Sequence, residues 1–354
     1  MKTLKLLLIP FSLLYGIITW IRNICFDFGI LPSKSFNIPI ISVGNLRAGG
    51  TGKTPHIEYL IKLLTPKHKT AVLSRGYGRK TSGFILADEN TKSKEIGDEP
   101  MQIFKKFKSV SVAVHANRVK GIKNLLNIKP EIKAILLDDA FQHRYVTPGL
   151  SILLTEYSDL YSNDFMLPTG NLREFAGGAS RADIIIVTKT PNIFSPLDRR
   201  SILDKINPKP YQRVYFSYTK YGDLVPLNKP EEENPFTKEY YFERNYSFLV
   251  LTGIAKAINI QYYLKSKVSE VIPMAFADHH QYTSDDINEL HKTFNSIASS
   301  KKIIITTEKD SMRLLDPEIS ALLADLPIFY LPLEVIFHGN DEINFNNHIL
   351  DHVR

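Results

Sequence analysis

Short apolar runs alternate with segments of helical periodicity along the first part of the chain. Residues 39–43 form an apolar run rich in β-branched side chains, and residues 54–64 then carry apolar side chains three and four positions apart. These two patterns predict a buried strand followed by an amphipathic helix. Further strands are predicted at 69–74, 110–114, 134–137, 150–154 and 184–187. Because strands and helices alternate, we expect a parallel sheet with helices on both faces.

The pattern changes near residue 210. Residues 211–218 alternate like a solvent-exposed strand, and the charged, proline-bearing stretch 229–239 has the composition of a linker or surface excursion. A second, smaller α/β unit is predicted from strands at 247–251, 271–276 and 302–306, helices at 256–265 and 284–297, and an apolar run at 328–333.

A glycine-dense loop separates the first strand from the first helix. The order strand, glycine loop, helix is the context of a phosphate-binding P-loop, in which backbone N–H groups bind a polyphosphate. Lys53 would reach the β- and γ-phosphates of ATP, and the Thr54 hydroxyl would ligate Mg²⁺. The common spacing has glycine at position 47, where this chain has Arg47. The alternative is a glycine-rich turn without a ligand. The candidate ATP-binding residues are Gly49, Gly50, Thr51, Gly52, Lys53 and Thr54.

Acidic residues follow one of the predicted buried strands. Asp138 and Asp139 come directly after 134–137, as in a Walker B motif, in which one carboxylate holds Mg²⁺. The pattern does not decide which of the two contacts the metal. The segment that begins at Thr188 resembles the guanine-binding signature of GTPases, but Pro191 replaces its aspartate, which favours ATP over GTP.

Other charged residues lie in predicted loops at strand or helix ends. Asp98 precedes a proline and a helix, where it either caps the helix or has a chemical function. Arg118 follows the strand 110–114, and Arg173 lies in a polar loop from which an arginine can neutralise a transferring phosphoryl group. Asp278 and the adjacent His279 and His280 follow the strand 271–276 and could tune a proton acceptor or bind a metal, although a metal site needs more ligands than this run shows.

Composition restricts the classes of binding partner and the chemistry open to cysteine. The chain has 354 residues, a net charge of +7 and a pI near 9.1, which fits nucleic acid, an anionic lipid surface or a phosphorylated substrate. Its basic residues form no long run and no nucleic-acid-binding motif, so we expect no nucleic-acid partner. The single cysteine, Cys25, excludes an internal disulfide and a cysteine metal cluster.

The N-terminus combines basic residues with an apolar run at 6–21. A signal peptide, a spanning helix, a core helix and an interfacial anchor each fit part of this pattern. We favour the anchor, with Trp20 at the headgroups, because the run is short and no convincing cleavage site follows it. Three domains are therefore predicted: an N-terminal membrane-associated helix (1–35), a P-loop kinase domain (36–210), and linker strands with a smaller C-terminal α/β domain (211–354).

A series of segments in order resembles one family, the tetraacyldisaccharide 4'-kinases, which are the lipid A 4'-kinases of Gram-negative bacteria. The segments span residues 21–310 and include the glycine pattern GNxxxGGTGKTP, so Arg47 agrees with the family even though it departs from the general P-loop. Ala140 stands where the family often has glycine. The matching segments are IRNICFDFG, PIISVGNLRAGGTGKTP, SRGYGR, GDEP, HANR, LDDAFQHR, PTGNLRE, FADHH and TTEKD.

This resemblance implies transfer of a phosphoryl group from ATP to the 4'-hydroxyl of an acylated glucosamine disaccharide 1-phosphate. It implies a monotopic enzyme on the cytoplasmic face of the inner membrane, with the reaction between two α/β domains. By resemblance, Asp98 is the base that accepts the hydroxyl proton and His279 pairs with it. Arg173 would stabilise the transferring phosphoryl group, and Arg118 would do the same or hold the lipid 1-phosphate.

Two other functions fit part of the pattern. One is a different membrane-associated P-loop enzyme, such as a small-molecule kinase or a GTPase, and the other is a nucleotide-gated adaptor without catalysis. An adaptor has no need of Asp98 and His279, and ATP turnover that depends on glycolipid would separate these functions. The sequence leaves open the acyl chains of the acceptor, the oligomeric state, and whether the N-terminal helix spans or lies on the bilayer.

Overall fold

The computed structural model describes residues 8–228, 236–254, 258–278 and 280–354. The described part of the chain forms two compact units. Unit 1 comprises Met1–Asn90, Ile103–Thr219 and Val335–Arg354, and unit 2 comprises Thr91–Gln102 and Lys220–Glu334. The predicted domains were continuous stretches, whereas each observed unit is assembled from separated segments.

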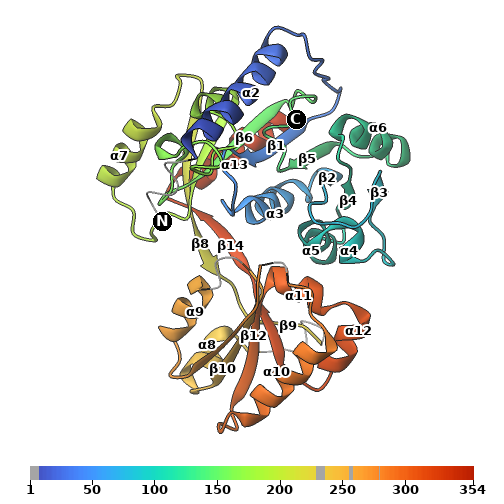
Figure 1. Ribbon diagram of the computed structural model, residues 1–354, viewed down its shortest axis with the longest axis vertical. Helices are drawn as coiled ribbons and strands as arrows, with labels where there is room; N and C mark the ends of the chain where they lie inside the picture. The colour runs from blue at the N-terminus through green and yellow to red at the C-terminus, as the bar shows by residue number, and fades with distance from the viewer. Residues whose placement is uncertain (1–7, 229–235, 255–257, 279) are drawn as a thin grey trace. The chain divides into compact units, whose positions relative to one another are not determined.

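Within its described residues, unit 1 is built on a nine-stranded sheet in the order β14-β8-β7-β6-β1-β5-β2-β4-β3 (Figure 1). The strand pairs from β8 to β4 are parallel, and β3 is antiparallel to β4. The strands are β1 (Ile40–Asn45), β2 (Thr70–Ser74), β3 (Ile85–Leu86), β4 (Ser111–Val114), β5 (Ala134–Asp138), β6 (Leu150–Glu156), β7 (Ile184–Thr188), β8 (Arg213–Tyr221) and β14 (Leu333–Phe337).

Helices cover both faces of this sheet. Neighbouring strand residues point to opposite sides, and the apolar side chains on each side pack against helices. Ile41 packs in one core with α3 (Lys53–Leu64) and α13 (Asp341–Val353), whereas Ile40 packs in another with α6 (Arg118–Ile128). A third core lies under α7 (Pro196–Ile206). The predicted doubly covered parallel sheet is confirmed. The remaining helical segments of unit 1 are α2 (Ile9–Asp27), η1 (Tyr161–Asn163) and η2 (Ala176–Arg181).

The strand predicted at 211–218 is present as β8, but the prediction that it is solvent-exposed is wrong. Tyr215, Phe216 and Ser217 are all buried, because β8 lies inside the sheet between β7 and β14. The chain returns to this sheet near its C-terminus, where β14 and α13 complete unit 1. The apolar run at 328–333 therefore contributes to two strands in two different sheets.

Within its described residues, unit 2 has a five-stranded sheet in the order β11-β10-β12-β13-β9, with β9 antiparallel. Thr283 caps α10 (Ser284–Ser296) through a reciprocal bond pair with Asp286. The strands are β9 (Val225–Pro226), β10 (Ser247–Thr252), β11 (Val271–Ala275), β12 (Lys302–Thr307) and β13 (Ile328–Leu331). The helices are α4 (Ser93–Ile96), α5 (Asp98–Lys106), α8 (Lys238–Glu243), α9 (Ile258–Lys265), α10 (Ser284–Ser296), α11 (Glu308–Leu314), α12 (Pro317–Ser320) and η4 (Ala321–Leu323), and α5 continues into unit 1.

Candidate active site

The glycine loop follows β1 and ends at α3, as predicted for a P-loop. Gly49 and Gly52 have φ of 120° and 87°, a region that favours glycine. Neighbouring side chains hold the loop at its carbonyl oxygens. The Thr188 hydroxyl donates to the Thr51 carbonyl at 2.9 Å, and Lys189 Nζ donates to the Gly50 carbonyl at 2.6 Å. These contacts from the end of β7 fix a backbone whose N–H groups can bind phosphate.

Arg47 is buried and bound to acidic residues of the protein. Its guanidinium pairs with Asp159 at 2.7 Å and Asp164 at 2.8 Å, and it donates to the Asp159 carbonyl. The adjacent backbone pairs with the polar loop, since Arg173 N donates to the Leu46 carbonyl at 2.8 Å. Arg47 thus replaces the usual glycine as a structural residue that ties the phosphate loop to the segment carrying Arg173.

Three predicted site residues form one charged cluster. Asp139 Oδ1 lies 3.7 Å from Lys53 Nζ and 3.1 Å from an Arg173 guanidinium nitrogen. Asp139 has a positive φ of 46° directly after β5, which turns it out of the strand direction. Asp138 ends β5 beside Val43 of β1 and is buried. The P-loop lysine, the Walker B acids and the loop arginine therefore meet at the carboxyl end of the sheet, where ligands bind in such folds.

Arg118 lies in the interior, with 1% of its surface exposed. Its guanidinium donates to the carbonyls of His115 at 3.0 Å, Ala116 at 3.2 Å and Asp138 at 3.2 Å. Burial lowers the pKa of Arg118 to about 10, and the nearby charges of Asp138 and Asp139 oppose that shift. The guanidinium supports the backbone that carries Asp138, and the direct phosphate contact implied by the resemblance stays a prediction.

His143 lies next to Arg118 and received no role from the sequence. Its Nε2 accepts a bond from the Arg118 backbone N–H at 3.2 Å. Burial, together with the positive charges of Arg118, Arg22 and Arg75, lowers the pKa of His143 to about 4. The imidazole is therefore neutral at physiological pH.

Asp98 belongs to unit 2, where it starts α5 and pairs with Arg313. Arg313 Nε lies 3.1 Å from Asp98 Oδ2, and the neighbouring Glu99 pairs with Lys309 at 3.6 Å. Sequence reasoning missed Arg313, although its place three residues after Asp310 on one helix could have indicated a paired side chain. His279 lies outside the described residues, so its expected pairing with Asp98 stays a prediction.

Several residues of the matching segments, to which the sequence assigned no individual role, bond α2 to the rest of unit 1. The Ser12 hydroxyl donates to the Thr169 hydroxyl at 2.7 Å, and Asn23 donates to Glu174 at 2.7 Å. Arg144 pairs with Asp27 at 2.6 Å. The polar loop around Arg173 therefore also binds the N-terminal helix α2.

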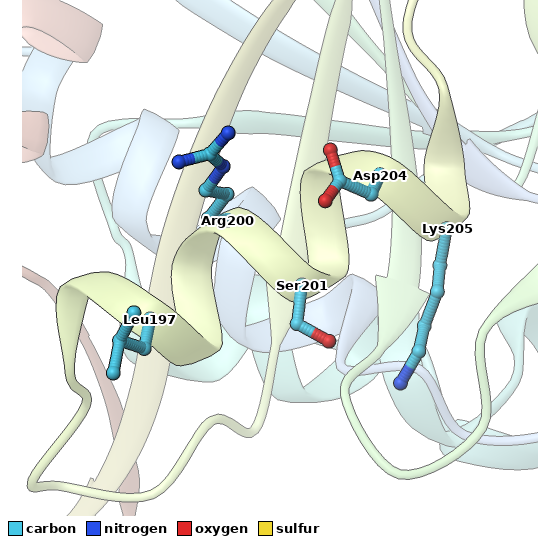
Figure 2. A pocket seen from close by; sticks show the side chains of 5 residues that line it. All are labelled: Leu197, Arg200, Ser201, Asp204 and Lys205. Atoms are coloured by element: carbon cyan, nitrogen blue, oxygen red, sulfur yellow. The ribbon is translucent and has the colours of Figure 1, made fainter.

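A surface hollow of about 450 Å³ lies on α7 (Figure 2). All of its lining side chains come from that one helix, and none is a predicted site residue. It is lined by Leu197, Arg200, Ser201, Asp204 and Lys205.

The parallel sheet, glycine loop and Lys53–Asp139–Arg173 cluster define a P-loop nucleotide-binding protein of the phosphotransferase type. A family model described as LpxK, tetraacyldisaccharide-1-P 4'-kinase, matches residues 4–354. The chain belongs to this family, and it is accordingly a kinase that transfers a phosphoryl group to a hydroxyl. The family, fold class and enzyme class expected from the sequence are confirmed.

Individual relatives agree with this assignment over nearly the whole chain. The chain is 45% identical to a tetraacyldisaccharide 4'-kinase of Bacteroides thetaiotaomicron, covering 98% of this chain and 93% of the relative. It is 46% identical to one of Flavobacterium johnsoniae, covering 100% and 98%. A crystal structure of LpxK from Aquifex aeolicus in complex with ATP matches with a TM-score of 0.76 at 27% identity, covering 99% and 100%. The comparisons do not favour the rival assignments as another P-loop enzyme or an adaptor.

Proposed function

We propose that this chain transfers the γ-phosphoryl group of ATP to the 4'-hydroxyl of an acylated glucosamine disaccharide 1-phosphate in lipid A biosynthesis. The observation that carries the proposal is the cluster in which Asp139 contacts both Lys53 and Arg173 beside the phosphate loop. Family membership over residues 4–354 supports the choice of acceptor. The domain organisation proposed with it is a membrane-associated helix, a P-loop domain and a smaller α/β domain.

The loop residues 49–54 would bind the phosphates of ATP, with Lys53 on the β- and γ-phosphates. Arg173 would neutralise charge on the transferring group, which is worth most in a site that excludes water. Arg118 would act by holding the Asp138 carbonyl, since its guanidinium donates to that oxygen. Phosphoryl transfer depends mainly on positioning and electrostatics, and these residues supply both.

The acidic residues fit a magnesium ion. Asp138 and Asp139 follow one another at the end of β5, which pairs with β1, and the Thr54 hydroxyl lies in the first turn of α3. Carboxylate and hydroxyl oxygens are the donors that Mg²⁺ prefers. When bound, the ion would neutralise negative charge on the phosphates of ATP.

Asp98 would take the proton of the acceptor hydroxyl while that oxygen attacks the γ-phosphorus and ADP departs. His279 would pair with Asp98 and raise its effectiveness as a proton acceptor. Asp98 belongs to unit 2 and the phosphate loop to unit 1.

The helix α2 would lie on the cytoplasmic face of the inner membrane without crossing it. It is long and apolar enough to cross a bilayer, with a mean hydropathy of 1.4, and little of it is buried. However, Ser12 near one end and Asn23 near the other both bond to unit 1, and a spanning helix would break those bonds. The apolar side chains exposed on α2 are Ile9, Phe11, Leu13, Leu14, Ile17, Ile18, Trp20 and Ile21.

A turnover assay tests the reaction. ATP hydrolysis and transfer should require an added tetraacylated glucosamine disaccharide 1-phosphate, and a phosphate should be found on its 4'-oxygen. Lys53→Ala serves as the inactive control. ATP turnover at the same rate without glycolipid, or with the product phosphorylated elsewhere, contradicts the proposal.

Vesicle flotation tests the membrane assignment. The double variant Ile17→Asn/Ile18→Asn should release the protein from anionic vesicles, because it removes apolar area from the exposed side of α2. The matched control is Leu197→Asn, which changes an apolar side chain on α7 that is more exposed than Ile17 or Ile18. Equal flotation of both variants would exclude α2 as the membrane contact.

A further inference from the structure

Arg313 is a buried cation that contacts three segments of unit 2 besides its own helix. Its side chain is 1% exposed. Nε lies 3.1 Å from Asp98 on α5, and a terminal nitrogen lies 3.2 Å from Asp310 on α11. The other terminal nitrogen donates to the carbonyls of Gly253 at 3.3 Å, after β10, and His280 at 2.8 Å, after β11.

Asp310 already balances the charge of Arg313. Asp310 is fully buried, and its Oδ2 accepts bonds from the Gly253 N–H at 3.1 Å and the Thr307 hydroxyl at 2.7 Å. One fixed carboxylate of this kind is sufficient to compensate a buried guanidinium. The second carboxylate, Asp98, is therefore not required for charge balance, and its contact with Arg313 points to a role in positioning.

The same guanidinium also restrains the segment after β11. It holds the His280 carbonyl, while the His280 ring pairs with Asp286 at 2.9 Å and stacks on Phe276 with centroids 4.5 Å apart. His280 follows His279 directly in the sequence. A planar guanidinium can bond a carboxylate and a carbonyl in fixed directions at once, which an ammonium group cannot reproduce.

We propose that Arg313 is a positioning residue that holds the Asp98 carboxylate and the His280 backbone in one fixed arrangement for proton removal from the acceptor. This inference rests on the proposed function, in which the hydroxyl proton passes to Asp98 as its oxygen bonds to the γ-phosphorus and the bond to ADP breaks. Arg313 contacts neither substrate in this scheme. It acts through the orientation of Asp98.

The test measures steady-state phosphorylation of the glycolipid by full-length protein. Arg313→Lys keeps the positive charge but loses the planar set of N–H donors that contacts both Asp98 and the His280 carbonyl. The Asp98 carboxylate should then be misplaced, and kcat should fall roughly 10- to 100-fold, the size expected for a misplaced catalytic group. The KM for ATP should stay within about twofold, because the phosphate loop is not altered. In Arg313→Ala, added guanidinium should restore part of the lost rate. The matched control is Arg244→Gln, an exposed arginine of unit 2, which should leave kcat unchanged.

Combining variants separates this inference from the proposed function. Asp98→Asn should have a low kcat, and adding Arg313→Lys should lower kcat little further. The effects of substitutions at residues that act as one unit are not additive. A normal kcat in Arg313→Lys, or an additive double variant, overturns the positioning role while Asp98 stays the base. A normal kcat in Asp98→Asn removes the base itself, and with it the proposed mechanism.

A second variant covers the case in which Arg313→Lys does not fold. A methyl group at Gly253 would lie 3.2 Å from both Asp310 Oδ1 and the Tyr282 hydroxyl and 3.3 Å from an Arg313 nitrogen, so Gly253→Ala crowds the Asp310–Arg313 pair without removing the guanidinium. The same selective loss of kcat is expected. Unchanged kcat in this variant would overturn the inference.

Discussion

The imidazole of His56 joins the phosphate loop to strand β8. Its Nδ1 lies 2.7 Å from the Gly52 carbonyl oxygen, and its Nε2 lies 3.1 Å from the Ser217 hydroxyl. Because a carbonyl oxygen can only accept, Nδ1 carries the proton and Ser217 donates to Nε2. Gly52, which precedes the first residue of α3, is thereby connected to a strand far along the chain.

His56 makes the stability of the protein depend on pH. Burial lowers the pKa of His56 to about 4, below the ordinary 6.5, so the unfolded chain binds more protons between these values. Its contribution is complete above pH 6.5 and is lost as the pH falls toward 4. We expect a loss of about 2 kcal/mol in unfolding free energy between pH 7 and pH 5.

Urea unfolding of the wild type and of His56→Gln at both pH values measures this loss. The stability gap between the two proteins should narrow by that amount at pH 5, since the variant lacks the titrating group. Parallel pH dependences would show that His56 is not the group responsible.

Asp98→Ala and His279→Ala should each reduce kcat by roughly 10²–10⁴, the usual range for loss of a general base. ATP affinity should change little, because neither residue belongs to the phosphate loop. Steady-state kinetics with glycolipid, together with ATP titration, provide both values. Full turnover in both variants would remove these residues from the chemistry.

Lys53 and Arg173 should differ in their effect on nucleotide binding. Lys53→Ala should weaken ATP binding and slow the reaction, since the lysine would contact the phosphates in every bound state. Arg173→Gln should lower kcat by roughly 10²-fold with ATP binding nearly unchanged, because the proposed role of its charge is to stabilise the phosphoryl group as it transfers. Comparing Kd for ATP with kcat separates the two roles, and identical profiles would argue against them.

Arg47→Gly would restore the common P-loop spacing and is nevertheless expected to destabilise the protein. It leaves the carboxylates of Asp159 and Asp164 without their guanidinium, and Asp164 is mostly buried. Loss of such a partner should cost about 2 kcal/mol. Chemical denaturation measures the change, with Arg47→Lys as an intermediate case. Unaltered stability would mean that Arg47 does not tie the loop to its neighbour.

Gly44→Ala should destabilise unit 1 through a steric clash. A Cβ at position 44 would lie 2.7 Å from Phe141 Cβ and 2.9 Å from its backbone nitrogen. Overpacking of this kind costs about 1–3 kcal/mol. Gly50→Ala is the matched control for stability, because a Cβ there meets no atom within 4 Å. A similar unfolding midpoint for both variants would contradict the close approach of Gly44 and Phe141.

Several site residues could be predicted because their chemistry depends on local spacing. Lys53 follows a strand and a glycine loop, and Asp138 and Asp139 end an apolar strand, so each pattern is contained in a short window. Arg313 could not be predicted in this way. Its partners Asp98, Gly253 and His280 come from three separate segments, and its own helix looks like an ordinary capped turn.

The amino-acid sequence by itself determined the family, the alternating α/β fold and the phosphate loop, because these follow from periodicity and from motifs read along the chain. Tertiary structure decided which distant segments meet. In the fold, β8 is buried between β7 and β14, and the C-terminal α13 packs in unit 1. Asp98 belongs to unit 2, where it contacts Arg313. Such pairings depend on packing between residues far apart in sequence, and local patterns carry no information about those distances.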